Sequence, residues 1–544
     1  MAANGSRSTA QRSRKAGSRI SSDAATVSSS DLRSRSLSPE SLANFNSRLS
    51  MNGEKRELSH VSWKRLRKRS PWLKLLKKHQ KKGTEAIVST DGFAALFAQR
   101  TGKTWVTGAV LCVEYSVSLD VLLVGPLTNL ESTWGKFLAE KLPWYSVHRD
   151  LASYDTHRKK YPGEHRILLL NPEQVTPIRD KLRRRKWDRF IWDEAQRLKN
   201  RTSQSSKDAA LIAKSSKRRL ALTGTPMDLD PKDLWAIMRF VDHTVLGDAW
   251  KDFDQEFLVQ PNIDLSKCRG AIQRKKMILA NAIAKRKAPM REDMIDTFAE
   301  LLSPHVMRIS KEDAGIEPAK IKVIEIDLDP LEEKKYRQLE KTMVVKHRGT
   351  VIKTPLKITQ IGKLQQLTGG HIKDEDGEVH RTGTSKRRAL RKSILKYRRN
   401  DEPFVVFCKY VFEVHMIARF LERMNLGKGA RLWGKVKDLK KDKRRTNMLL
   451  GFQRGEYSWM VCQQRTGGVG VDLYRSRLFF AYSLGHSFID FDQMLSRGDF
   501  LEQTETARFF FLAVRRSIDT DIITAVRRKK SITEQFYGRL NNHD

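Results

Sequence analysis

Residues 190–200 read FIWDEAQRLKN, an apolar run that ends abruptly in two adjacent carboxylates, Asp193 and Glu194. The run is typical of a buried strand, and a parallel sheet brings the residues that follow its strands to the edge where ligands bind. One carboxylate can hold hydrated Mg²⁺ while its neighbour polarises the attacking water, as nucleoside-triphosphate hydrolysis needs. The stretch therefore predicts an α/β fold with an ATP site, in which Asp193 is a metal ligand and both carboxylates are catalytic.

A second motif lies upstream, where residues 97–104 read FAQRTGKT between an apolar strand and a helix-like segment. Backbone N–H groups at a helix N-terminus bind phosphate, Lys103 can reach the outer phosphates, and the Thr104 hydroxyl can ligate Mg²⁺. The turn expected to surround the phosphates consists of Arg100, Thr101 and Gly102. The pattern G-x-x-x-x-G-K-T is incomplete, because Phe97 occupies the first glycine position.

Each motif alone has a simpler interpretation. An isolated Asp-Glu pair is more often a helix N-cap with a solvated neighbour, and an isolated Gly-Lys-Thr is often a surface turn. Here the two motifs follow predicted strands in the order that a phosphate site requires. A third polar turn, residues 222–226 (LTGTP), ends another predicted strand. With Thr225 it is suited to contact phosphate or DNA and to pass the signal between lobes, although by itself it is a tight turn.

The chain has 544 residues, a hydrophobic content of 39% and a formal net charge of +41. This length exceeds what one core usually supports, so two core-forming domains are expected. Self-repulsion on this scale calls for a polyanionic partner, of which nucleic acid is the first candidate. Each basic run alone is more often a solvated face, but their shared sign favours salt-dependent, sequence-neutral binding. The runs are residues 64–69, 183–186, 440–445 and 527–530.

Short apolar runs alternate with helix-length amphipathic segments from Val61 onward, which is typical of parallel sheets covered on both faces. The strands predicted for a first lobe are Phe93–Ala98, Val121–Gly125, Ile167–Leu170, Arg189–Asp193 and Arg219–Thr223. Those predicted for a second lobe are Ile321–Leu328, Phe404–Cys408, Trp459–Cys462, Phe479–Ala481 and Arg508–Leu512. The fold class is therefore α/β, with two parallel-sheet lobes in tandem.

The predicted domains are a disordered Ser/Arg-rich basic tail (1–58), a first lobe (59–317), a second lobe (318–530) and a C-terminal tail (531–544). The basic tail contains one aromatic residue, Phe45, and cannot fold alone. A transit peptide is the alternative for it, weakened by its acidic residues. A Lys/Arg-rich helical protrusion is expected at about 260–312, and residues 345–399 predict an exposed excursion.

Cysteines and apolar stretches indicate a protein of a reducing interior compartment. No C-x-x-C pair occurs, so neither a zinc site nor a disulfide framework is indicated. The most apolar stretch, residues 106–127, is interrupted by Glu114 and Asp120 and predicts a buried helix and strand instead of a membrane span. The expected location is the cytoplasm, that of a host bacterium if the source is a virus, or the nucleus if it is eukaryotic.

The order of the motifs resembles superfamily-two helicase motors of the Snf type, the chromatin-remodeller ATPase group. The likeness spans about residues 60 to 530 and includes HQKKG at 79–83, TGGVGVDL at 466–473 and the segment 492–503. It implies two RecA-like lobes that close around ATP and Mg²⁺ and reopen after hydrolysis. The compact layout, with TGGH at 368–371 and YSLG at 482–485, looks most like helicase-like proteins of bacterial viruses.

The resemblance also implies roles for individual residues. Gln80 would read adenine, while Lys103, Thr104, Asp193 and Glu194 would have the phosphate, metal and water roles given above. Residues of the second lobe that would complete the site are Gly470, Asp472, Gln493 and Arg497. Nucleic-acid backbone contacts are implied for Asn129, Trp134, Arg465 and Thr466, in addition to Thr225. A core-facing position is an equally weighted interpretation of Trp134.

One position departs from the family pattern. The last motif ordinarily carries R-x-x-R, and here Phe500 stands where the second arginine, the arginine finger, is expected. A finger contributes about 10³- to 10⁵-fold in turnover, roughly 4 to 7 kcal/mol of barrier. Either another cation such as Arg465 or Arg508 substitutes for it, or the ATPase is weak or silent.

Three functions are compatible with these features. The leading hypothesis is a monomeric, DNA-dependent ATPase that translocates along double-stranded DNA through backbone contacts and acts on DNA or on other DNA-bound proteins, without a membrane partner. A DNA-binding protein with a decayed motor is the second, motivated by Phe97 and Phe500. An RNA helicase of the related D-E-A-H kind is the third, and it is disfavoured because such proteins usually carry Ser-Ala-Thr where residues 222–226 stand.

Overall fold

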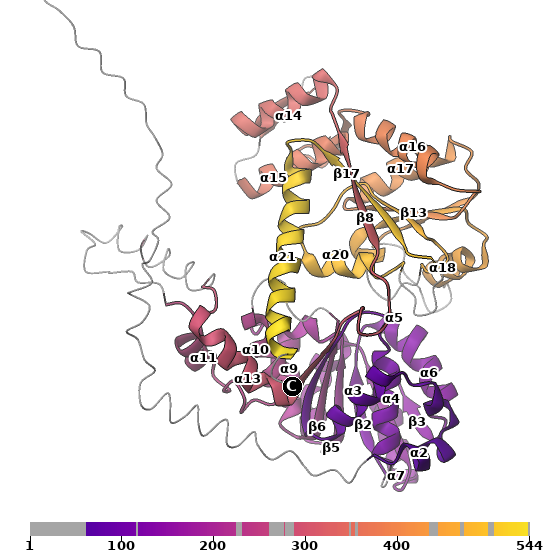
Figure 1. Ribbon diagram of the computed structural model, residues 1–544, viewed down its shortest axis with the longest axis vertical. Helices are drawn as coiled ribbons and strands as arrows, with labels where there is room; N and C mark the ends of the chain where they lie inside the picture. Colours follow the sequence, from indigo (N-terminus) through magenta and orange to yellow (C-terminus); the bar gives the residue numbers. More distant parts are fainter. Residues whose placement is uncertain are drawn as a thin grey trace, which may run out of the picture. The chain divides into compact units, whose positions relative to one another are not determined.

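The computed structural model describes residues 61–115, 118–224, 231–260, 277, 288–347, 350–353, 357–434, 444–467, 473–498 and 505–541. These residues form two α/β lobes, each built around one large sheet whose paired strands run parallel. Figure 1 shows the first lobe in indigo to magenta and the second in red-orange to yellow. The prediction of two parallel-sheet lobes is confirmed.

The first lobe contains a seven-stranded sheet with the order β3-β4-β2-β5-β6-β1-β7. Its strands are β1 (Gly92–Phe97), β2 (Asp120–Val124), β3 (Tyr145–His148), β4 (His165–Leu170), β5 (Trp187–Asp193), β6 (Ser216–Thr223) and β7 (Val306–Ile309). Every residue of β1, β2 and β4 is buried, as expected for apolar strands that helices cover on both faces. The five predicted strands are present, and β3 and β7 are additional strands at the two edges.

Helices cover both faces of this sheet. The helices described in the first lobe are α2 (Trp63–Arg69), η1 (Pro71–Leu75), α3 (Lys78–Val88), α4 (Lys103–Val113), α5 (Leu127–Asn129), η2 (Leu130–Trp134), α6 (Gly135–Lys141), α7 (Leu151–Lys160), α8 (Pro172–Arg183), η3 (Ala195–Leu198), α9 (Gln204–Ala213), η4 (Pro231–Asp233), α10 (Leu234–Val241), α11 (Trp250–Phe257), η6 (Glu292–Met294), α13 (Ile295–Leu302) and η7 (Ser303–His305). On one face Ala95 of β1 shares a core with Val110 of α4 and Leu138 of α6. On the other, the rings of Phe190 and Phe240 lie 5.0 Å apart between β5 and α10.

The second lobe contains a six-stranded sheet with the order β14-β15-β13-β16-β17-β8. Its strands are β8 (Lys320–Ile326), β13 (Phe404–Cys408), β14 (Gly429–Leu432), β15 (Trp459–Gln463), β16 (Leu478–Ala481) and β17 (Arg508–Val514). Its helices are α14 (Pro330–Thr342), α15 (Lys357–Thr368), α16 (Ser385–Tyr397), α17 (Val411–Glu422), α18 (Arg444–Arg454), α19 (Gln464–Gly467), α20 (Phe488–Leu495) and α21 (Ile518–Asn541). Alternate residues of β13 face opposite cores: Phe407 packs with residues of α20 and α21, and Val406 with residues of α16 and α17.

The described residues of the segment 345–399 belong to the second lobe. The segment contains the hairpin strands β9 (Val344–His347), β10 (Thr350–Lys353), β11 (His371–Lys373) and β12 (Val379–Arg381), together with α15 and α16. Leu390 and Ile394 of α16 are fully buried in the lobe core. The predicted exposed excursion is therefore wrong for α16, because apolar residues at helical spacing bury one face of a segment that is polar on average.

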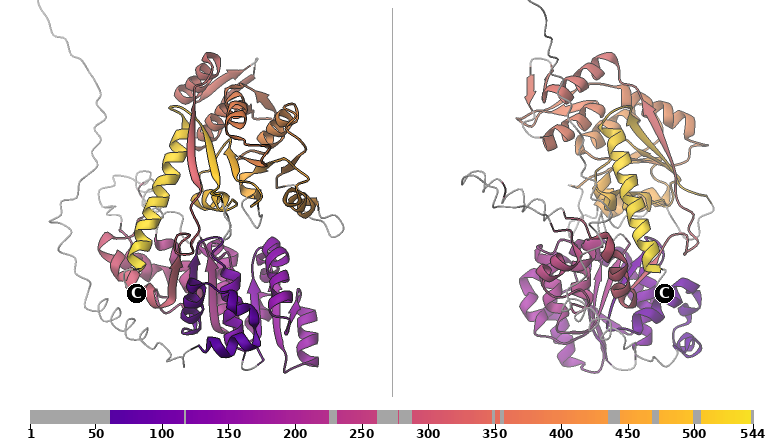
Figure 2. Two further views of the ribbon diagram at one scale, coloured as in Figure 1. Left: turned by 45° about the vertical axis from the view of Figure 1, so that its right-hand side comes forward. Right: turned by 60° about the vertical axis from the view of Figure 1, so that its left-hand side comes forward.

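Two elements cross predicted boundaries. Residues 306–309, inside the expected protrusion, form β7, which pairs in parallel with β1 through Ala94 and Val306. Helix α21, the yellow helix that leads to the C-terminus in Figure 2, continues past residue 530 to Asn541. Residues 1–58, and 261–276 and 278–287 of the protrusion, lie outside the described residues. In the part of the chain that is described, no helix combines the length and apolar character needed to cross a membrane.

Candidate nucleotide site

The loop between β1 and α4 carries the predicted phosphate-binding residues. Thr101 Oγ1 donates to the Ala98 carbonyl at 2.8 Å. Two side chains of α3 hold the loop from outside, since His79 Nε2 lies 3.0 Å from the Thr101 carbonyl and Gln80 Nε2 donates to that carbonyl at 3.1 Å. Helix α4 begins at Lys103, so its first backbone N–H groups adjoin the loop. Backbone N–H groups at a helix start of this kind can bind an anion, and phosphate binding by this loop stays a prediction.

Two glycines explain how this loop packs. Gly102 has a φ of +95°, and a Cβ at this position would lie 2.1 Å from Gln80 Nε2. A Cβ at Gly83 of α3 would lie 2.7 Å from the ring of Phe97. Phe97 is fully buried, and its ring occupies the space that Gly83 leaves open. The residue that breaks the sequence pattern is therefore accommodated in the core against α3.

Gln80, predicted to read adenine, is 4% exposed. Its Oε1 atom accepts a hydrogen bond from Lys77 N at 3.0 Å, and its Nε2 atom donates to Thr101. Both ends of the amide are engaged in joining the start of α3 to the phosphate loop. In this arrangement Gln80 positions the loop, and contact with a base stays a prediction.

Lys103 lies at the carboxyl edge of the sheet. Its Nζ atom donates to the Phe97 carbonyl at 2.9 Å and to the Ala98 carbonyl at 3.4 Å. Burial lowers the pKa of the Lys103 ammonium, and the carboxylates of Glu194 and Asp193 oppose that shift. The predicted cation and the two predicted carboxylates thus share one electrostatic environment. The half-buried Thr104 follows Lys103 in the first turn of α4.

Asp193 ends β5 and is 5% exposed. Its Oδ1 atom accepts from Glu194 N at 3.0 Å. Burial raises the pKa of Asp193, Glu194 raises it further, and hydrogen bonds from Trp134 and Asn129 act in the opposite direction. A carboxylate whose pKa is shifted by burial and by neighbouring charged groups is typical of functional sites.

Glu194 is joined to the next strand by side chains. Its backbone is left-handed, with a φ of +57°. Gln196 Nε2 donates to Glu194 Oε2, and Thr223 Oγ1 at the end of β6 donates to Gln196 Oε1 at 2.6 Å. This chain connects the carboxylate pair to the turn at 222–226, whose residue Thr225 lies outside the described residues.

Asn129 and Trp134, predicted as nucleic-acid contacts, both reach the same oxygen of Asp193. Asn129 Nδ2 donates to Asp193 Oδ2 at 3.2 Å, and Trp134 Nε1 donates to it at 3.0 Å. The Trp134 side chain is 1% exposed. Of the two interpretations of Trp134, the structure supports the core-facing one, and the indole N–H points toward the Asp193 carboxylate.

The predicted residues of the second lobe are only partly described. Gln493 lies on α20 and Arg497 two residues after its end, and they are 7% and 5% exposed. Arg465 is exposed on α19. The side chain of Thr466 and the residues Gly470, Asp472 and Phe500 lie outside the described part of the chain. Their roles stay predictions.

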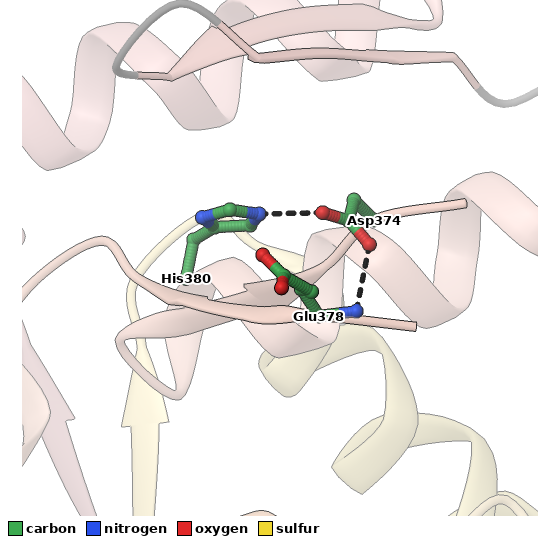
Figure 3. Close-up of side chains that lie close together, drawn as sticks. All are labelled: Asp374, Glu378 and His380. Carbon is green, nitrogen blue, oxygen red and sulfur yellow. Dashed lines mark hydrogen bonds and ion pairs between the residues drawn. The ribbon is translucent and has the colours of Figure 1, made fainter. Parts of the chain in front are cut away.

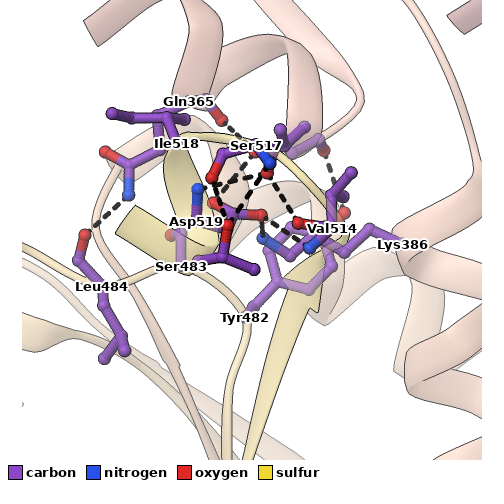
Figure 4. A network of polar contacts seen from close by, with 12 residues as sticks. Gln365, Lys386, Tyr482, Ser483, Leu484, Val514, Ser517, Ile518 and Asp519 are labelled. Atoms are coloured by element: carbon purple, nitrogen blue, oxygen red, sulfur yellow. Dashed lines mark hydrogen bonds and ion pairs between the residues drawn. The ribbon is translucent and has the colours of Figure 1, made fainter. Parts of the chain in front are cut away.

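A buried polar network, which sequence reasoning missed, lies at the carboxyl ends of β16 and β17 (Figure 4). Lys386 Nζ of α16 lies 2.6 Å from Asp519 Oδ2 of α21, and both side chains are at least 95% buried. Val514 N donates to the same oxygen at 3.2 Å, and Thr368 Oγ1 donates to Asp519 Oδ1 at 3.1 Å. The network ties α15, α16 and α21 to the end of β17. No local sequence pattern relates residues so far apart.

Glu413 and His371, beside this network, predict opposing pH effects on stability. Burial raises the pKa of Glu413 to about 7 and lowers the pKa of His371 to about 4. Their facing atoms, Glu413 Oε1 and His371 Nδ1, are 3.9 Å apart. The stabilising contribution of Glu413 is complete below its unfolded pKa and is lost as the pH rises through about 7. That of His371 is complete above its unfolded pKa and is lost as the pH falls toward about 4.

The two slopes offset each other in the wild type, so single replacements are expected to reveal them. Relative to the wild type, Glu413→Gln should gain up to about 1.4 kcal/mol of unfolding free energy per pH unit as the pH rises. His371→Gln should gain a similar amount as the pH falls. Urea unfolding of the wild type and the two variants between about pH 4 and pH 7 measures both slopes. A difference from the wild type that does not change with pH would contradict the assignment.

A cluster of metal-ligand types also occurs at the β11–β12 hairpin, where Asp374, Glu378 and His380 lie close together (Figure 3). His380 Nε2 lies 2.6 Å from Asp374 Oδ2, and Glu378 N donates to Asp374 Oδ1 at 2.8 Å. The hydrogen bond with His380 is the main cause of a lowered pKa for Asp374. These contacts close the hairpin turn, and they account for the cluster without an ion.

The sheet of the first lobe, the loop between β1 and α4, the carboxylate pair after β5 and a second parallel-sheet lobe are the features that the sequence motifs predict. The model of the SNF2-related domain matches residues 34–387, which is more than half of the chain. The chain belongs to this family, as its motifs predict.

Curated relatives are similar over most of this chain. Putative ATP-dependent helicase/translocase YwqA of Bacillus subtilis is 22% identical over 65% of this chain and 36% of its own length. Protein CHROMATIN REMODELING 5 of Arabidopsis thaliana is 21% identical over 77% of this chain and 24% of its own length. The chain thus spans about a quarter to a third of these relatives. The solved Sulfolobus solfataricus SWI2/SNF2 ATPase core in complex with dsDNA is 20% identical over 86% of this chain and 94% of that chain, with a TM-score of 0.36.

Proposed function

We propose that the protein is an ATP-dependent translocase on double-stranded DNA, which couples hydrolysis to movement along DNA or to remodelling of protein–DNA complexes. The observation that carries the proposal is the convergence of Lys103, Asp193 and Glu194 beside a phosphate loop in an SNF2-family chain. The net charge of +41 supports a polyanionic track. A monomeric state and action on DNA-bound proteins are parts of the same proposal.

The residues present fit ATP and Mg²⁺. The first turn of α4 adjoins the loop, and the backbone N–H groups of a first helical turn, which have no partner within the helix, can bind phosphate. The hard oxygens of Thr104 and Asp193 are the ligand type that Mg²⁺ prefers, together with water and substrate phosphates. When bound, Mg²⁺ neutralises charge on the phosphates.

Each of the protein's own groups has a separate task in this proposal. Lys103 holds the outer phosphates, Asp193 holds the metal, and Glu194 orients and deprotonates the attacking water. The hydrogen bonds from Glu194 through Gln196 to Thr223 connect that carboxylate to the turn at 222–226. If DNA binds at this turn, the hydrogen bonds provide a route by which that binding changes the position of the Glu194 carboxylate.

ATP turnover measured side by side with duplex DNA, single-stranded DNA and RNA tests the proposal. Duplex DNA is expected to give the largest stimulation, and its affinity should fall by about 10³-fold or more between about 50 and 200 mM salt if six or more phosphates are contacted. Stimulation by RNA alone would favour the RNA helicase. Duplex binding without turnover would favour a DNA-binding protein whose motor Phe500 has weakened.

A further inference from the structure

The segment that follows β2 contains a turn wider than an α-helix. Residues Leu130–Trp134 form the π-helix η2, closed by a hydrogen bond from Gly135 N to the Leu130 carbonyl. An i→i+5 bond of this kind is rare and occurs mostly as single turns, frequently at functional sites. Arg149 Nη2 donates to the same Leu130 carbonyl at 3.2 Å, which satisfies the oxygen further.

The wide turn decides where Asn129 and Trp134 point. At 3.6 residues per turn, side chains five positions apart are separated by about 140° around a helix. A turn that closes over five residues places them on the same side instead. Both side chains therefore meet Asp193 Oδ2, with donor distances of 3.2 and 3.0 Å.

The Asp193 carboxylate is held from several directions. Oδ2 accepts the two side-chain hydrogen bonds, and Oδ1 accepts from Glu194 N at 3.0 Å. On another side Gly125 lies so close that a Cβ there would be 3.0 Å from Asp193 Cβ. Trp134 and Asp193 are nearly inaccessible to solvent, at 1% and 5% exposure. A carboxylate fixed in this way keeps one orientation.

We propose that Asn129 and Trp134 are positioning residues that orient Asp193 for Mg²⁺, and that the indole of Trp134 does not contact nucleic acid. The inference rests on the proposed function, because it assigns these donors to the metal carboxylate of that site. Partners that orient a metal ligand typically contribute 10- to 100-fold to metal affinity. The segment from Leu127 to Trp134 thereby connects the Asp193 carboxylate, proposed to hold Mg²⁺, to the adjacent protein surface.

Trp134→Phe tests the assignment, because it removes the indole N–H and keeps an aromatic ring. The readout is the binding of a fluorescent ATP analogue, titrated with Mg²⁺ in the absence of turnover. The Mg²⁺ concentration for half-maximal binding is expected to rise about tenfold or more. Affinity for duplex DNA, measured separately, is expected to stay within about twofold, because only a buried donor is lost.

Trp192→Phe is a matched control. Trp192 is fully buried, immediately precedes Asp193, and its Nε1 atom makes no hydrogen bond within the described residues. The replacement removes an indole of the same size from the neighbouring residue of β5, whose ring packs toward Phe240 of α10, and the Mg²⁺ requirement should not change. Asn129→Ala, in a half-buried position, removes the other donor and gives the same test if Trp134→Phe does not fold.

The outcomes are distinct. A Mg²⁺ requirement that is unchanged in both Trp134→Phe and Asn129→Ala would overturn the inference while leaving the proposed function intact. Weaker duplex binding with an unchanged Mg²⁺ requirement would also overturn it and would restore the nucleic-acid role. Failure of the wild type to bind the analogue with Mg²⁺ would overturn the proposed function and the inference together.

Discussion

Lys103→Ala is expected to lower DNA-stimulated phosphate release by about 10²- to 10³-fold, which is about 3 to 4 kcal/mol of barrier. The ammonium of Lys103 now donates to the Phe97 and Ala98 carbonyls and interacts with Glu194 and Asp193. Lys103 is half-buried, and its replacement removes the cation that the proposed function assigns to the outer phosphates. Steady-state phosphate release at saturating duplex DNA measures the effect.

Lys136→Ala is the control for this experiment, because Lys136 is exposed on α6 in the same lobe. It should turn over ATP at the wild-type rate. If the wild type and Lys103→Ala release phosphate equally slowly at saturating DNA, the motor function is excluded. The remaining hypotheses would then be a DNA-binding protein whose ATPase has decayed and an RNA helicase, which stimulation by RNA would identify.

Lys386→Met is expected to destabilise the second lobe by about 3 to 5 kcal/mol, because it leaves the buried Asp519 carboxylate without its cation. The pair is separated by 2.6 Å, and the two side chains are 1% and 5% exposed. Hydrogen bonds from Val514 N and Thr368 Oγ1 remain, but neither carries a charge. Urea unfolding of wild type and variant, followed by circular dichroism, gives the difference.

Arg388→Met is the matched control, since Arg388 lies on the same helix, two residues away. Its ion pair with Asp329 has side chains 61% and 43% exposed. Exposed pairs of this kind contribute about 0 to 1 kcal/mol. Equal losses of unfolding free energy in Lys386→Met and Arg388→Met would show that the buried Lys386–Asp519 pair is no more stabilising than an exposed ion pair.

The sheet strands could be predicted where the sequence alone makes burial evident. Strand β13 begins and ends as predicted, because five consecutive apolar residues leave one interpretation. Edge strands give a weaker signal. In β3 only Tyr145 is buried, and in β7 only Val306 and Ile309 are buried. Both strands pair on one side only, so neither has the continuous apolar run that marks a central strand.

The charged residues of the candidate nucleotide site could be predicted from the sequence. The residues that pack against them and hold them in place could not. Lys103, Asp193 and Glu194 follow strands, so their common edge could be inferred from order alone. The space for Phe97 depends on Gly83, which belongs to another helix. The Lys386–Asp519 pair joins residues separated by 133 positions. Such pairings arise from the assembled fold, and composition and spacing do not contain them.

The π turn at Leu130–Trp134 also has a consequence for the permitted lengths of this segment. One additional residue in a regular helix would rotate everything downstream by about 100°, and this turn absorbs that rotation. Phe137 and Leu138 of α6 thus keep their places in the core. A version one residue shorter, wound as an ordinary α-helix, would separate Asn129 and the indole by about 40° and present both donors again. A change in the length of this segment is therefore tolerated only if the side chains at its two ends keep their directions around the helix axis. The identities of the residues between them matter less.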